Sequence, residues 1–258
     1  MDNALIVFLK YPEPGKVKTR LAKDIGNEKA YRIYKSLAEN VIKNIFPKNQ
    51  RRYDVHIFFT PADKKNEIIA WIKLLIGNDL ETGTHYIPQE GTNLGERMSN
   101  AFKQTLQGRR YKRTLTQNHH NQITPPSEGM DKGRVEKLAK TCPHINEENN
   151  ISSCNTIIIG TDCPEIDAPL IEDAFELLKE KDVVIGPCND GGYYLLGMSR
   201  FVHDLFADIP WSTDRVFDRT MEKIQKNNLS CSILKTLADI DTQEDLYRYA
   251  PNIFTFID

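Results

Sequence analysis

The stretch ALIVFLKYPEPGKVKTR (residues 4–20) decides the fold and raises the question of function. Its opening apolar run is typical of a central parallel strand that is covered on both faces. Two prolines and Gly15 then exclude further strand pairing, and residues 17–26 predict a helical turn or two that ends at Gly26. Four cations surround this loop: Lys10, Lys16, Lys18 and Arg20.

The overall charge of the chain does not explain these cations. The 258 residues carry a formal net charge of −2, whereas a dedicated nucleic-acid binder normally presents a strongly basic face. The cations are therefore a local feature, and a local anion is their simplest partner. Hydrophobic residues make up 40% of the chain, which is ample for a buried core.

The sequence predicts a reduced cytoplasmic protein that does not cross a membrane. No apolar run approaches the roughly 20 residues that a spanning helix needs. The start MDNALIVFLK lacks the basic residues and the long apolar stretch of a secretion signal. The cysteines are odd in number and form no CxxC pair, which argues against a disulfide framework or a structural zinc site. They are Cys142, Cys154, Cys163, Cys188 and Cys231.

Strands alternate with helices along the chain. Strands are predicted at 4–9, 53–60, 85–88, 156–160, 182–187, 193–198 and 231–235. Helices are predicted at 28–46, 62–76, from about 94, and at 168–180, 200–207, 214–227 and 241–250. This order predicts an α/β three-layer sandwich with a mainly parallel sheet and helices on both faces. The turn between 187 and 193 indicates one antiparallel strand.

Residues 109–155 interrupt this pattern. The segment is polar, and its first half has no apolar periodicity. An unstructured loop of this length is rare inside a compact domain, so we interpret it as a flexible insertion. The chain 1–258 is then a single domain that carries this insertion.

The loop after the first strand is suited to phosphate. In open α/β sheets, ligands bind beyond the carboxyl ends of the strands. Backbone N–H groups near Gly15 and the following helix start favour an anion, Arg20 can bind two phosphate oxygens, and lysines act as point charges. The predicted phosphate-binding residues of this loop are Lys10, Pro14, Gly15, Lys16, Lys18 and Arg20. The loop matches neither GxxxxGK[ST] nor GxGxxG, and a solvated basic helix start is the alternative.

Asp162 is the predicted metal ligand and a catalytic residue. It stands at the end of a buried strand, where it can hold Mg²⁺ or Mn²⁺ against a diphosphate. Asp190, in the turn NDGG, is the second catalytic candidate, either as another ligand or as a base on an acceptor hydroxyl. The alternative for Asp190 is an ordinary hairpin turn.

Other segments predict the remaining walls of a pocket. Gly95 and Arg97, at a loop-to-helix entry, are further phosphate-binding candidates, with a simple helix entry equally compatible. The predicted acceptor-binding residues are Gly191, Gly192, Tyr193 and Trp211. For Trp211 a core position beside a helix cap from Ser212 or Thr213 is slightly preferred.

Three further features accompany these segments. The stretch DIDTQEDL predicts a capping box from Thr242 to Asp245, and Asp239 or Asp241 reaches the metal if this segment lies beside the site. Cys163 and Cys188 flank the candidate carboxylates and are interpreted as small buried residues.

Several of these motifs occur together in one known family. KYPEPGKVKTRL, LGERM, IIIGTDCP, GPCNDGGYYLLGM, PWST and DIDTQEDL, in this order, resemble a bacterial glycosyltransferase-like family, also labelled radical-SAM/selenodomain-associated transferase. The resemblance spans nearly the whole chain except 109–155. It implies a GT-A nucleotide-diphospho-sugar transferase fold, and more distantly it is similar to 2-phospholactate and molybdenum-cofactor guanylyltransferases.

The resemblance implies a nucleotide over the first loop, a divalent metal on Asp162, and an acceptor near Asp190. Three functions stay open. The first is metal-dependent transfer of a sugar from a nucleotide-diphospho-sugar to a small-molecule acceptor. The second is nucleotidyl transfer from a nucleoside triphosphate to a phosphorylated acceptor with release of pyrophosphate. The third is nucleotide binding without turnover. The base, the sugar, the acceptor and the oligomeric state are not indicated by the sequence.

Overall fold

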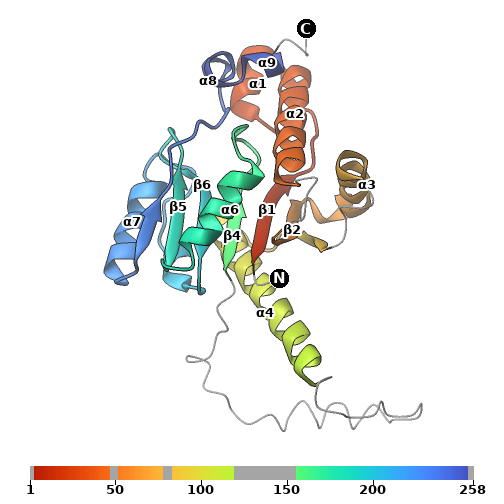
Figure 1. The fold of residues 1–258 in the computed structure, drawn as a ribbon. Coiled ribbons are helices and arrows are strands. Elements are labelled where there is room, and N and C mark those ends of the chain that lie inside the picture. The colour runs from red at the N-terminus through yellow and green to blue at the C-terminus, as the bar shows by residue number, and fades with distance from the viewer. Residues whose placement is uncertain (1–2, 47–51, 78–82, 119–154, 255–258) are drawn as a thin grey trace, which may run out of the picture.

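One seven-stranded sheet organises the protein (Figure 1). The structure is a computed structural model that describes residues 3–46, 52–77, 83–118 and 155–254. The strand order is β3-β2-β1-β4-β6-β5-β7. The strands are β1 (Ala4–Lys10), β2 (Asp54–Thr60), β3 (Thr84–Pro88), β4 (Thr156–Ile159), β5 (Val183–Pro187), β6 (Tyr193–Met198) and β7 (Cys231–Ile233).

The sheet is parallel except for β6, which runs antiparallel to both β4 and β5. The predicted antiparallel strand is therefore confirmed. Along β1, Lys10 pairs with Thr60 of β2, and Val7 pairs with Ile159 of β4. This register brings the loop after β1 and the loop after β4 to the same edge of the sheet.

Helices cover both faces of the sheet, as predicted. They are α1 (Thr19–Ile25), α2 (Asn27–Ile45), α3 (Lys65–Ile76), α4 (Leu94–Asn118), α6 (Ala168–Leu177), α7 (Val216–Lys226), α8 (Gln243–Tyr249) and α9 (Pro251–Phe254), with 3-10 turns η1 (Ala62–Lys64) and η3 (His203–Phe206). Alternate residues of β1 enter different cores because successive strand side chains point to opposite faces. Leu5 packs with α2, α3 and α6, whereas Ile6 packs with α4 and α7.

The described elements differ from the sequence predictions in a few places. The predicted helix at 200–207 is only the short 3-10 turn η3. Helix α4 runs to Asn118, past residue 109, where the flexible insertion was predicted to begin. Most of that segment, 119–154, lies outside the described residues, so its predicted flexibility stays a prediction. None of the helices in the described ranges is long and apolar enough to cross a membrane.

The C-terminal segment returns across the sheet to the first helices. In Figure 1 the blue helices α8 and α9 lie beside α1 and α2. A separate apolar cluster joins them, with Leu21 and Leu37 packed in the same group as Ile240 and Leu246. Thr242 and Asp245 form the predicted capping box at the start of α8. This packing carries Asp239 and Asp241 to the strand ends of β1 and β4.

Candidate functional site at the strand ends

A cavity of about 780 Å³ opens at the carboxyl ends of β1 and β4. Segments distant in sequence form its wall: the loop after β1, the loops after β4 and β5, the start of α4, and residues before α8. Ten predicted site residues line it: Lys10, Lys16, Lys18, Arg20, Arg97, Asp162, Asp190, Gly192, Tyr193 and Trp211. Four predicted residues, Pro14, Gly15, Gly95 and Gly191, do not form part of this wall.

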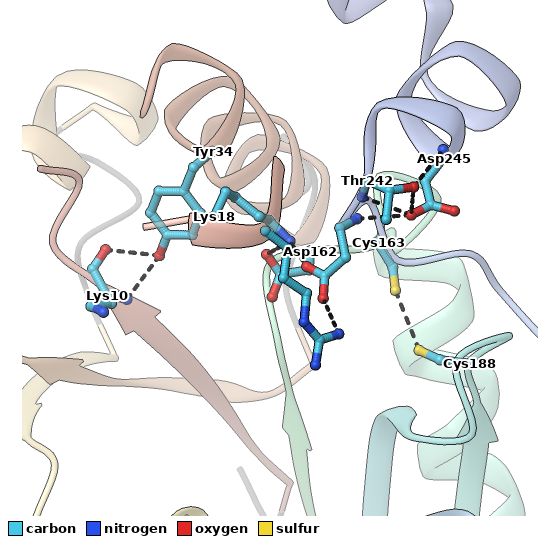
Figure 2. Close-up of polar contacts among 10 residues, drawn as sticks. Lys10, Lys18, Tyr34, Asp162, Cys163, Cys188, Thr242 and Asp245 are labelled. Carbon is cyan, nitrogen blue, oxygen red and sulfur yellow. Dashed lines mark hydrogen bonds and ion pairs between the residues drawn. The ribbon is translucent and has the colours of Figure 1, made fainter. Parts of the chain in front are cut away.

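Lys18 joins two carboxylates inside the cavity. Its Nζ lies 2.7 Å from Asp162 Oδ1 and 2.8 Å from Asp241 Oδ1 (Figure 2). The Lys18 side chain is only 4% exposed. Burial lowers the pKa of Lys18, but the charges of Asp162 and then Asp241 outweigh it and hold this pKa above its ordinary value. The ammonium is therefore charged, and it connects the loop after β1 to both later loops.

The backbone at Lys18 is also unusual. Lys18 has φ 45° and ψ 49° and is the residue before α1. A non-glycine residue rarely adopts this left-handed conformation. In this conformation the Lys18 side chain lies against Asp162 and Asp241.

The other cations of the first loop are more accessible. Arg20 is 64% exposed, and its Nη1 lies 3.4 Å from Asp241 Oδ2. Lys16 is 65% exposed and pairs with Glu13 at 3.2 Å. Lys10 Nζ donates to the backbone carbonyl of Lys16. Weak, exposed pairs of this kind exchange readily for an anionic ligand.

Tyr34 fixes the end of β1, and sequence reasoning missed this role. Its hydroxyl accepts a hydrogen bond from Lys10 N at 2.9 Å and donates to Lys10 O at 2.8 Å (Figure 2). Burial, and next the negative charge of Asp162, raise the pKa of Tyr34 above its ordinary value. In the sequence Tyr34 appears only as one apolar position on the buried stripe of its helix, so no signal distinguishes it.

The remaining carboxylates of the cavity carry negative charge close together. The pKa of Asp239 is raised to about 6 by burial, followed by the charges of Asp190 and Asp241. Asp190 Oδ1 accepts a hydrogen bond from Gly192 N at 2.8 Å. In the described part of the chain neither Asp190 nor Asp239 forms an ion pair with a lysine or arginine. Such a group of carboxylates favours a cation.

Backbone hydrogen bonds hold the three carboxylate-bearing loops together. Ile240 N donates to Asp162 O at 3.2 Å, and Asn189 N donates to Leu237 O at 3.2 Å. Between the loops, Cys163 Sγ and Cys188 Sγ lie 3.7 Å apart. The hydrogen bond between the two thiols, together with burial, raises the pKa of Cys163 well above that of an ordinary thiol.

An aromatic wall closes the opposite side of the cavity. The rings of Tyr193 and Trp211 meet edge to face with centroids 6.4 Å apart. Gly95 lies against this indole, because a Cβ there would be 2.2 Å from Trp211 Nε1. Gly191 has φ +83°, and a Cβ there would be 2.0 Å from the Asp214 carbonyl oxygen. The absence of a Cβ at Gly95 and Gly191 therefore lets Trp211 and the backbone of Asp214, respectively, lie directly against the main chain.

The helix cap predicted beside Trp211 is wrong. Helix α7 begins at Val216, and its N-cap residue is Arg215, which provides no side-chain cap. Thr213 Oγ1 instead donates to Pro210 O at 2.7 Å and accepts from Arg215 N at 3.3 Å. The hydroxyl thus stabilises the turn before the helix, two residues before the N-cap position.

The carboxylates fit a hard divalent cation. Asp162 and Asp241 supply oxygen donors from two neighbouring loops, and oxygen donors are what Mg²⁺ prefers. Burial raises the pKa of Asp239 most, and the negative charges of Asp190 and Asp241 raise it further, an effect that a nearby cation would oppose. In the sequence, Asp239 and Asp241 were expected near the metal only if their segment lay beside the site, and the structure places it there.

Comparisons with known proteins agree with this architecture. The family model "Uncharacterized protein conserved in bacteria (DUF2064)" matches residues 129–213, a stretch that includes Asp162 and Asp190. A crystal structure from Desulfovibrio desulfuricans G20, provisionally described as a nucleotide-diphospho-sugar transferase, is 25% identical, with a TM-score of 0.69 over 99% of this chain and 94% of that chain. The predicted GT-A-like α/β fold is therefore confirmed. No curated protein matches the chain.

Two more distant solved structures also align. The 4-diphosphocytidyl-2C-methyl-D-erythritol synthase of Anaerococcus prevotii DSM 20548 is 8% identical, with a TM-score of 0.48 over 98% of this chain and 100% of that chain. A cytidylyltransferase from Leptospira borgpetersenii serovar Hardjo-bovis is 11% identical, with a TM-score of 0.46 over 95% of this chain and 83% of that chain. These similarities are too distant to bear on activity.

Proposed function

We propose that the protein is a metal-dependent transferase that moves a sugar from a nucleotide-diphospho-sugar to an acceptor. The observation that carries the proposal is the convergence of the basic loop and the strand-end aspartates in one cavity. Lys18 Nζ contacts Asp162 and Asp241 there, and Lys16 and Arg20 line the same cavity. A diphosphate needs such a combination of mobile cations and metal-binding carboxylates.

The similarity to the Desulfovibrio protein supports the same substrate class. That protein is provisionally described as a nucleotide-diphospho-sugar transferase, and the alignment spans nearly both chains. Fold similarity alone does not determine the reaction of a protein, whereas the residues of the cavity limit the chemistry that it can perform.

Each group has a distinct role in this proposal. Asp162, with Asp241 beside it, holds the Mg²⁺ or Mn²⁺ ion, which stabilises the negative charge of the diphosphate leaving group. Lys16 and Arg20 bind the phosphate oxygens from the solvent side. Asp190, which also lines the cavity, accepts the proton of an acceptor hydroxyl. Trp211 and Tyr193 provide a surface on which an acceptor ring can pack.

Nucleotidyl transfer is the second candidate function. The observation that favours it is the number of cations, because five basic side chains line one cavity and suit a triphosphate as well as a diphosphate. In this reaction a phosphate oxygen of the acceptor attacks the α-phosphorus and pyrophosphate leaves. The two reactions therefore differ in the product that carries the diphosphate.

A product assay separates the candidates. The full-length protein is incubated with Mg²⁺ and either a panel of nucleotide sugars or the nucleoside triphosphates with candidate phosphorylated acceptors. Release of a nucleoside diphosphate from a nucleotide sugar supports glycosyl transfer, and release of pyrophosphate from a triphosphate supports nucleotidyl transfer. Thermal-shift measurements with each nucleotide select the panel, because a ligand that binds the folded state raises its melting temperature.

Asp162→Asn is the decisive variant, and Asp173→Asn is its matched control. Asp173 is an exposed carboxylate on α6 that does not line the cavity. We expect Asp162→Asn to lower metal-dependent turnover at least 100-fold while the control keeps it, since loss of a metal ligand removes stabilisation of the leaving group. Full turnover by Asp162→Asn contradicts the proposal. Nucleotide binding that survives in Asp162→Asn, with no turnover in the wild type, instead supports a binding protein.

A further inference from the structure

Two cysteines and two aspartates lie in the wall of the cavity, next to the residues that pair with Lys18. Cys188 Sγ and one carboxylate oxygen each of Asp190 and Asp239 all lie within 4.8 Å of one another. Cys163 Sγ lies 3.7 Å from Cys188 Sγ, and Figure 2 shows the two side chains pointing toward each other from neighbouring loops. The proposed transfer reaction gives the two thiols no task.

The separation of the two sulfur atoms matches a metal site. Thiolates bound to one tetrahedral zinc ion at about 2.3 Å lie about 3.8 Å apart, because the angle between them is close to 109°. The two sulfurs therefore need almost no movement to bind one ion. A carboxylate oxygen from Asp190 or Asp239 can complete the coordination from the side of Cys188.

The backbone already holds these groups in place. Cys188 pairs with Leu237 in a parallel bridge, and Cys188 N donates to Gly192 O at 3.0 Å. The loop that carries Cys163 is joined to the loop that carries Asp239 by the hydrogen bond from Ile240 N to Asp162 O. Cys163 is 2% exposed, so its sulfur cannot turn away into solvent without local opening. A site with fixed ligands loses little conformational entropy when it binds an ion.

The charge around the thiols also favours a cation. Asp190 and Asp239 form no ion pair with a lysine or arginine among the described residues, whereas Asp162 and Asp241 share Lys18. A thiolate prefers a softer ion than the oxygen ligands do, and Mg²⁺ binds thiolates poorly. The carboxylates of Asp162 and Asp241 therefore suit Mg²⁺, whereas the two thiols suit a softer ion.

The geometry points to a second cation site, formed by Cys163, Cys188 and a carboxylate of Asp239 or Asp190, that takes a thiophilic divalent ion such as Zn²⁺ in preference to Mg²⁺. Binding replaces the thiol protons with the metal, so up to two protons are released to solvent for each ion bound. The inference does not depend on the proposed transfer reaction, because the ion alone is the ligand.

Cobalt spectroscopy tests the site directly. The test protein is the full chain with Cys142→Ser, Cys154→Ser and Cys231→Ser, which leaves Cys163 and Cys188 as its only thiols. Reduced protein is titrated with Co²⁺, whose bonds to thiolate give a near-ultraviolet charge-transfer band. We expect a band that saturates at one Co²⁺ per chain, is abolished by one equivalent of Zn²⁺, and persists in a 100-fold excess of Mg²⁺.

Two further substitutions in this background locate the ligands. Cys188→Ser should reduce the band by at least half, and Cys163→Ser with Cys188→Ser should remove it. Asp239→Asn should weaken Co²⁺ binding about tenfold, while the matched control Asp173→Asn, on the exposed face of α6, should leave it unchanged. Circular dichroism shows whether each variant is folded.

X-ray absorption of the zinc-loaded protein provides a measurement that needs no loss-of-binding variant. Zinc–sulfur scattering at about 2.3 Å is expected. Zinc bound only by oxygen, absence of the charge-transfer band in the two-thiol background, or a band abolished by the excess of Mg²⁺ would each overturn the inference. Failure of the transfer assay would leave these spectroscopic results unchanged, so the two proposals fail independently.

Discussion

The two pairs of carboxylates at the strand ends have different neighbours to compensate their negative charge. Asp162 and Asp241 share the buried ammonium of Lys18, at 2.7 and 2.8 Å. Asp190 and Asp239 lie beside two thiols, and the pKa of Asp239 is raised to about 6 by burial and then by its acidic neighbours. For the first pair the protein itself supplies a cation, whereas the second pair has no ion-pair partner among the described residues.

In the metal-free protein, this difference gives the first pair a structural role that the second pair lacks. The Lys18 pair connects the first loop of the fold to the last, so it contributes to stability even when the cavity is empty. Asp239, whose pKa is raised, costs stability at neutral pH in the metal-free protein, and a bound cation would offset that cost. The substitutions below test this contrast, beginning with the largest expected effect.

Lys18→Met should cause the largest loss of stability. Without the ammonium, Asp162 and Asp241 face each other uncompensated, and breaking a buried pair is strongly destabilising. Because both carboxylates are partly exposed, we expect a loss at the lower end of the usual range, about 3 kcal/mol. Urea denaturation at pH 7 without divalent cations measures it. Adding Asp241→Asn to Lys18→Met should recover part of the loss, and a double variant as unstable as Lys18→Met would show that the charges do not matter.

Gly191→Ala should cause the second-largest loss of stability. The added Cβ would lie 2.0 Å from the Asp214 carbonyl oxygen, in a backbone conformation with φ +83°. We expect a loss of about 2 kcal/mol because the turn that holds Asp190 must shift. Gly192→Ala is the control, since its nearest neighbour is the movable Asp190 side chain at 3.0 Å and no positive φ is involved. Equal losses in both variants would argue against this explanation.

Asp239→Asn should raise the stability of the protein, whereas the two substitutions above lower it. A carboxyl group whose pKa is about 6 in the folded state and near 3.8 when unfolded binds its proton more tightly in the folded protein. Its contribution is therefore favourable at low pH and is lost as the pH rises from about 4 through 6. We expect Asp239→Asn to stabilise the metal-free protein by about 1 kcal/mol at pH 8, discounted for partial exposure, and by nearly nothing at pH 4. Thermal denaturation at both pH values in chelator measures this, and a wild-type advantage at pH 8 would contradict it.

Arg20→Gln should change stability least. The side chain is 64% exposed and its pair with Asp241 is long, at 3.4 Å, so the loss should stay within about 0.5 kcal/mol. The variant should nevertheless bind a nucleoside diphosphate about tenfold more weakly, because Arg20 faces the cavity. Calorimetry measures the affinity, with Lys43→Gln on the exposed side of α2 as the matched control. Equal affinities in both variants would remove Arg20 from the site.

The sequence predicts the order and pairing of the strands better than it predicts the side-chain contacts between the loops. The apolar runs of β1 and β4 indicate buried strands, and parallel pairing then places Lys10 and Asp162 at one edge without further information. The partner of Lys18 could not be inferred in the same way. Its two contacts depend on a left-handed backbone at Lys18 itself and on the return of the segment before α8, and neither has a local sequence signal.

The thiol pair shows a similar limit of sequence reasoning. Cys163 and Cys188 are 25 positions apart and belong to no spacing motif, so each is interpreted separately as a small buried residue. Only the strand order, with antiparallel β6 between β4 and β5, brings their loops together. Gly95 is a different case. The sequence makes it a phosphate-binding candidate, whereas in the structure it lies directly against the indole of Trp211.

The most direct measurement is electron paramagnetic resonance of bound Mn²⁺ with and without each nucleoside diphosphate. One site formed jointly by the first loop and Asp162 predicts that a diphosphate tightens Mn²⁺ binding at least tenfold, with phosphorus hyperfine coupling on the protein-bound ion. Asp162→Asn and Arg20→Gln should each remove most of that tightening. Tightening of the same size in both variants would contradict the central claim that these two regions bind one diphosphate.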